Sequence, residues 1–262
     1  ANRSSCDMVT HLSSSPSSRS RSPVPRRSEG TAHSSLRHTL DAWALPMIAD
    51  ASDVLPAEAS AVLDWWYGDL AARLKPDYQH RYQLWFSRAA DDEIKRRFGG
   101  AIAAVGGSDE KRRAWCRSPR GAIAYIVLLD QLNRNVHRGT AQMFAHDAKC
   151  TEEARRLVDE RRHLDGSLAA PELAHVSICL SHSESLDDHT LNGQLIRELV
   201  VPSPQRRDFD GHAHMAGVHA EEIRRFGRYP HRNALLGRQD TAEEAEWLVQ
   251  SAGVGYHKQV QK

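Results

Sequence analysis

The sequence predicts an all-α fold built from antiparallel helical hairpins. Apolar residues recur at helical spacing in one segment after another, as in Ile94, Phe98, Ile102 and Val105. Alternation of polar and apolar residues never persists beyond a few positions, which argues against strands. Glycine and proline close the apolar runs at intervals that suit helices of about ten to eighteen residues with short connections.

The N-terminal region differs from the rest in composition. Residues 1–50 are rich in Ser, Arg and Pro and contain few apolar residues, so they predict an extended tail. An Arg-rich and acid-poor N-terminus is typical of organelle targeting segments. The alternatives are an Arg/Ser phosphorylation segment and an extension that docks on a partner. We expect the helical domain over residues 57–250 and a short C-terminal tail over residues 251–262.

Local signals place several helix ends. The helix through Ile223 and Phe226 is expected to stop at Gly227 and Pro230. Ser118 and Pro119 form a predicted N-cap and first turn, and the apolar run Ala122–Leu132 that follows predicts a central buried helix. Thr151 is expected to cap a helix that carries acidic residues in its first turn. Thr241, with Glu three residues later, predicts a capping box for the last helix.

The bulk composition excludes several classes of protein. A chain of 262 residues with 40% hydrophobic and 26% charged residues is typical of soluble globular proteins. The apolar run Ala122–Leu129 is far shorter than the roughly 20 residues that a membrane-spanning helix needs. A net charge of +1 gives no general attraction to nucleic acid, and the four cysteines lack disulfide or zinc spacing.

Three segments resemble a bacterial family known as domain of unknown function 924. They are WCRSPRGAIAYIVLLDQLNRNVHRGTAQMFAHD (Trp115–Asp147), LSHSESLDDH (Leu180–His189) and the segment with FGRYPHRNALLGR within His219–Leu248. The resemblance covers roughly residues 61–249 and implies a helical array similar to tetratricopeptide repeats. It brings no established reaction. The chain departs from the family pattern at Leu132-Asn133, Ser181 and His189.

Polar residues of these three segments form the candidate site. The set comprises Asp130, Arg134, Asn135, His182, Glu184, Arg228, His231, Arg232, Asn233 and Arg238. Asp130 and Arg134 lie four residues apart on one helix and can pair directly. Two interpretations stay open. The arginines could bind a phosphate or carboxylate with His182 or His231 as proton carrier, or the set could be a buried ionic network that fixes the order of the helices.

The histidines do not have the spacing of a metal site. His212 and His214 lie two residues apart, so a helix would direct them to different faces, and no HExxH motif occurs. The sequence also contains no GxGxxG, GxxxxGK[ST] or GxSxG motif. We therefore expect neither a metal nor a cofactor.

These features together predict a non-catalytic helical scaffold. We expect an accessory subunit of a large mitochondrial assembly on the matrix side, such as a respiratory or ATP-synthase complex or a mitochondrial ribosome. Its partners would be other protein subunits, and the cytoplasm is the alternative location. An enzyme or binding protein for an anionic small molecule is one alternative function. An RNA-binding module that uses residues 1–50 is the other.

Overall fold

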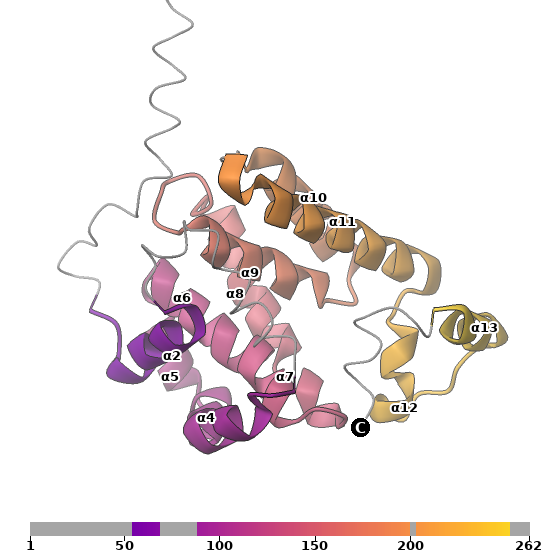
Figure 1. Cartoon of the computed structure of the whole chain (residues 1–262), viewed down its shortest axis with the longest axis horizontal. Coiled ribbons are helices and arrows are strands. Elements are labelled where there is room, and N and C mark those ends of the chain that lie inside the picture. The colour runs from indigo at the N-terminus through magenta and orange to yellow at the C-terminus, as the bar shows by residue number, and fades with distance from the viewer. Residues whose placement is uncertain (1–53, 69–87, 200–202, 252–262) are drawn as a thin grey trace, which may run out of the picture.

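A computed structural model describes residues 54–68, 88–199 and 203–251, the last range with side chains from residue 211 onward. Every regular element in those ranges is a helix (Figure 1). In chain order they are α2 (Ala57–Tyr67), α4 (Asp91–Gly106), α5 (Asp109–Trp115), α6 (Pro119–Ile126), η3 (Val127–Leu132), α7 (Asn133–Val136), η4 (Ala141–Phe144), α8 (Asp147–Asp159), α9 (Ala170–Ser181), α10 (Leu186–Glu198), α11 (Ser203–Phe226), η5 (Pro230–Arg232), α12 (Asn233–Leu236) and α13 (Ala242–Gln250).

The all-α prediction is confirmed for these residues, whereas the resemblance to tetratricopeptide repeats stays a prediction. Helices α8, α9, α10 and α11 pack as successive neighbours, and α9 also contacts α6. The tail predicted for residues 1–50 lies outside the described residues, as do residues 252–262.

The predicted central helix is present as α6 followed by the π-helical turn η3. Its N-cap is the expected one, because the Ser118 hydroxyl accepts a hydrogen bond from the Gly121 amide at 3.1 Å and Pro119 occupies the first turn. Side chains from Ala122 to Leu129 have 0% exposure. A π-helical turn pairs each carbonyl with the amide five residues later, as Leu128 does with Asn133.

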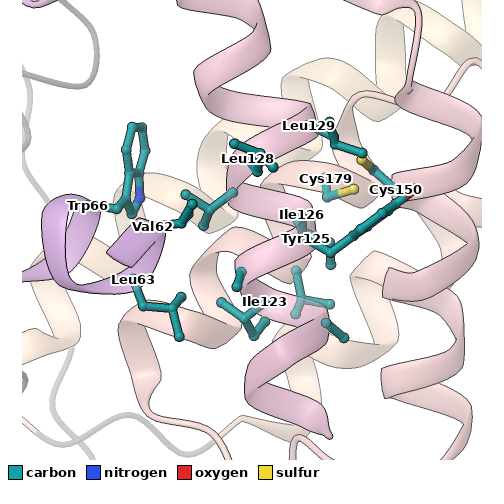
Figure 2. Packing of buried hydrophobic residues seen from close by; sticks show 14 of the residues in the cluster. Val62, Leu63, Trp66, Ile123, Tyr125, Ile126, Leu128, Leu129, Cys150 and Cys179 are labelled. Carbon is teal, nitrogen blue, oxygen red and sulfur yellow. The ribbon is translucent and has the colours of Figure 1, made fainter. Parts of the chain in front are cut away.

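Helices on both sides bury apolar faces against this centre. The stripe Ile94–Val105 of α4 is buried as predicted, and α4 packs against η3 and α7. Figure 2 shows Leu63 and Trp66 of α2 on one side of α6. The Trp66 indole N–H donates to His175 Nε2 of α9 at 2.9 Å. The buried histidine thus ties α2 to α9.

The predicted N-cap at Thr151 is wrong. Helix α8 begins four residues earlier, at Asp147, and Thr151 lies inside the helix with 2% exposure. Its neighbours Cys150 and Ala154 are buried on the same helix. Burial against α6 and α9 therefore extends the helix toward the N-terminus, beyond the capping signal at Thr151. The predicted stop at Gly227 and the capping box at Thr241 are both confirmed.

Replacement of Gly121 by alanine is expected to destabilise the fold. A Cβ atom at this position would lie 1.8 Å from the main-chain oxygen of Trp115, which cannot move without displacing the end of α5. Overpacking of this kind costs about 1–3 kcal/mol in the free energy of unfolding. Urea denaturation followed by circular dichroism measures the change.

Gly100→Ala is the matched control. Gly100 lies inside α4 and a Cβ there meets nothing within 4 Å, so the same substitution should stabilise by about 0.5–1 kcal/mol. Equal effects at the two positions would show that the α5–α6 corner does not require glycine.

Candidate functional site

The candidate site is centred on Asp130, a fully buried carboxylate in the π-helical turn η3. Arg134 Nη1 donates to its Oδ1 and to its main-chain oxygen, both at 2.8 Å. His182 Nδ1, at the end of α9, lies 2.8 and 3.0 Å from the two carboxylate oxygens. Burial opposes ionisation of Asp130, but the charge of Arg134 and the hydrogen bond from His182 outweigh it and hold the pKa below its usual range.

A second carboxylate, Asp147 at the start of α8, is shared by two arginines. Its Oδ2 accepts hydrogen bonds from Arg134 Nη2 at 2.9 Å and from Arg232 Nη1 at 3.1 Å. Arg232 Nη2 also donates to the main-chain oxygen of His182 at 2.9 Å. The network therefore joins η3, α7, α8, the end of α9 and η5.

Aromatic rings cover the Arg232 guanidinium. Its carbon lies 4.6 Å from the ring centre of Phe144 and 4.5 Å from that of Tyr229, distances at which a cation is attracted to the ring. Burial lowers the pKa of Arg232 and Arg134 adds to this, while Asp147 opposes the change. The guanidinium is thus held in a dry environment with a shared counterion.

Glu184 forms the neighbouring pair. Arg238 donates to both of its oxygens, at 2.7 and 2.9 Å, and the Tyr229 amide donates to Oε1 at 2.9 Å. Burial opposes ionisation, but these hydrogen bonds outweigh it and hold the pKa of Glu184 below its usual value. Two groups of the C-terminal segment, the Arg238 side chain and the Tyr229 amide, thus hold Glu184 in place.

Arg228 and Asn233 belong to a separate network at α13. Arg228 binds both oxygens of Glu244, at 2.6 and 2.7 Å, and Asn233 Nδ2 donates to Asp240 at 2.7 Å. The hydrogen bond from Arg228 lowers the pKa of Glu244 to about 2 against the effect of burial. These two residues fix the C-terminal helix instead of lining a common site.

Asn135 and His231, two other members of the predicted set, also contact residues outside the Asp130 network. Asn135 donates to Asp91 of α4 at 2.8 Å, so it does not join Arg134. A helical residue next to Arg134 is rotated by about 100° around the axis, which turns it toward α4. His231 lies 3.4 Å from the Glu222 carboxylate of α11 and beside Tyr229.

The set predicted from the sequence therefore divides into groups. Asp130, Arg134, His182 and Arg232 form one network, with Glu184 and Arg238 next to it through Tyr229. Sequence reasoning missed Asp147, Phe144 and Tyr229. Asp147 and Phe144 stand in the RGxxxxFxxD string that carries the family resemblance, which was the available signal.

The arrangement restricts the chemistry that the site can perform. Each guanidinium of the set is engaged by a carboxylate of the same chain. The thiols of Cys116, Cys150 and Cys179 are buried, and burial raises the pKa of each, so they are not thiolate nucleophiles. Within the described ranges, no His, Cys, Asp and Glu side chains gather in threes to hold a metal ion.

Residues 62–252 match the family described as bacterial protein of unknown function (DUF924). The chain belongs to this family. A solved structure of a protein of unknown function from Agrobacterium tumefaciens is similar, with a TM-score of 0.59 and 26% sequence identity. The similarity covers 74% of this chain and 98% of that one. No curated protein matches the sequence.

The mitochondrial location expected from the N-terminal composition is wrong. The family is bacterial, and the similar structure comes from a bacterium, which points away from a mitochondrion. Arginine- and serine-rich composition is compatible with several kinds of segment and does not by itself specify a targeting signal. In the part of the chain that the structure describes, no helix is long and apolar enough to cross a membrane.

Removal of the shared carboxylate tests the network. Asp147→Asn leaves Arg134 and Arg232 adjacent without their common counterion, and we expect a loss of about 3 kcal/mol in the free energy of unfolding. The control is Asp109→Asn, which breaks the ion pair with Lys149 where the Asp109 side chain is 69% exposed. That change should leave the denaturation midpoint unaltered. A wild-type midpoint for Asp147→Asn would contradict the structural role of the network.

Proposed function

We propose that this chain is a non-catalytic helical scaffold, and that its Arg/His network serves to hold the helices in order. The observation that carries the proposal is the internal pairing of the arginines. The pairs are Arg134 with Asp130 and Asp147, Arg228 with Glu244, Arg232 with Asp147, and Arg238 with Glu184. A ligand phosphate or carboxylate that took the place of these carboxylates would have to break the pairs, at a cost of several kcal/mol for a buried one.

The positions of the pairs support the same proposal. Asp130, Asp147, His182 and Arg232 are far apart in the sequence, and each contact fixes one helix relative to another. Ion pairs placed at helix junctions favour a particular arrangement of helices over alternatives. Such a fixed array suits a protein that presents a surface to other protein subunits.

A second candidate function rests on His182. Its Nδ1 is held by Asp130, its side chain is 19% exposed, and among the described residues its Nε2 has no hydrogen-bond partner. An imidazole oriented by a carboxylate, with the other nitrogen open, is the arrangement of a general base. Burial and Arg134 lower the pKa of His182, which keeps it unprotonated near neutral pH.

The scaffold predicts a large native particle. Extracts of cells that express the protein, separated under native conditions, should contain the chain in particles far larger than its 29.4 kDa. The particle should dissociate in denaturant and not in the presence of nuclease. Recovery of the chain only as a free monomer would contradict the proposal.

Thermal melting separates the two candidates. If the arginines act only within the chain, inorganic phosphate and small phosphorylated or carboxylic metabolites should leave the melting temperature unchanged. A rise of several degrees, abolished in His182→Gln but retained in the surface variant His214→Gln, would favour the enzyme. A ligand present at 100 times its Kd stabilises by about 2.7 kcal/mol, which is well within the range of detection.

A further inference from the structure

One segment after α11 joins the helical body through polar contacts. We define the docking segment as residues 229–238, which comprise η5, α12 and the first residues that follow. Tyr229 OH donates to the Ser181 main-chain oxygen, and Glu184 accepts from both the Tyr229 amide and Arg238. Arg232 reaches Asp147. Figure 1 places α12 and α13 at one end of the molecule, beyond α11.

Glycines stand at both ends of this segment. Gly227 has φ +67° and Gly237 has φ +66°, in the left-handed region that other residues rarely adopt. A Cβ atom would meet nothing within 4 Å at either glycine. Each glycine thus stands at a turn of the backbone where a positive φ is required.

Four histidines surround the point where the docking segment meets the body. The ring of Tyr229, which is fully buried, lies with its centre 6.4 Å from His189 of α10, 5.5 Å from His219 of α11 and 5.2 Å from His231 of η5. His182 supplies the main-chain oxygen that accepts from Arg232. We call these four residues the histidine cluster.

Charged groups from every surrounding helix face the histidine cluster. They are Arg134 of α7, Arg232 of η5, Asp130 of η3, Asp147 of α8, Asp188 of α10, Glu222 of α11 and Glu184, which precedes α10. The carboxylates of Asp130, Asp147, Glu184 and Asp188 are already paired with arginines. A proton on His182 would place new positive charge next to Arg134, and one on His189 would place it next to Arg232. A proton on His219 would face the other three histidines. Glu222, which lies 3.4 Å from His231, favours a proton on that ring.

We propose that protonation of the histidine cluster releases the docking segment from the helical body. The proposal goes beyond the scaffold role, because it makes one part of the surface dependent on pH. Release would expose the histidines to water, separate Arg232 from Arg134, and leave the apolar core around α6 intact.

The lowered pKa values of three cluster histidines agree with release on acidification. Burial lowers the pKa of His182, of His189 and of His219, the last to about 3. A folded-state pKa below the unfolded value means that the docked form is fully stable above a pH of about 6.5 and loses stability as the pH falls below it. Asp130 and Glu184 also have lowered pKa values and stay ionised in that range. The histidines therefore dominate between about pH 6.5 and 4.5.

Fluorotyrosine NMR of the full chain tests the proposal. Tyr229 reports on the docking segment, Tyr125 of α6 has 0% exposure and reports on the core, and Tyr→Phe variants assign both signals. On acidification from pH 7.5 to 4.5, the Tyr229 signal should change to that of an exposed tyrosine while the Tyr125 signal stays in place. The ratio of released to docked chains should rise about tenfold per pH unit for each histidine that docking keeps neutral.

Variants of the cluster decide the outcome. His219→Gln should remove one of these tenfold factors, and His214→Gln, an exposed position on the same helix, should remove none. Far-UV circular dichroism at pH 7.5 establishes that each variant folds, and His189→Gln replaces His219→Gln if that variant does not. The proposal is overturned if the Tyr229 signal stays unchanged down to pH 4.5, or if the Tyr125 signal changes together with it. It is also overturned if the folded cluster variant keeps the pH dependence of the wild type.

Discussion

The buried carboxylate of Asp130 is the constraint on which the polar part of the structure depends. A carboxylate with 0% exposure in an apolar helix costs many kcal/mol unless it is paired and hydrogen-bonded. Arg134 and His182 supply those contacts from α7 and from the end of α9. The need to satisfy one charge thus fixes the relative positions of three helices around the centre of the fold.

Arg134, which pairs with Asp130, is itself a buried charge that needs further hydrogen-bond partners. Arg134 has a second nitrogen to satisfy, which Asp147 accepts, and Asp147 in turn accepts from Arg232. Each charged group compensates the lost hydration of the one before it by pairing with it. The network therefore extends from the core to the C-terminal segment. This chain of dependence makes the network a structural junction between η3, α7, α8, the end of α9 and η5.

Predictions based on local signals succeeded where the cause was local. The Ser118 cap, the stop at Gly227 and the Thr241 capping box depend on residues within four positions of each other. The Asp130–Arg134 pair was predictable for the same reason, since four residues separate one turn of a helix from the next. The predicted N-cap at Thr151 was wrong because burial of α8 against its neighbours set the start of that helix. No local sequence pattern reports such burial.

The sequence by itself determined the helical class, the central apolar helix and, except for Asp147, the charged residues of the network around Asp130. The tertiary structure decided how the predicted polar set divides: Asn135 turns to Asp91, Arg228 and Asn233 turn to α13, and Asp147 enters between two arginines. The physical reason is that a charged side chain pairs with whatever carboxylate folding brings within about 3 Å. Helix packing selects that partner, and it leaves no trace in the spacing of residues along the chain.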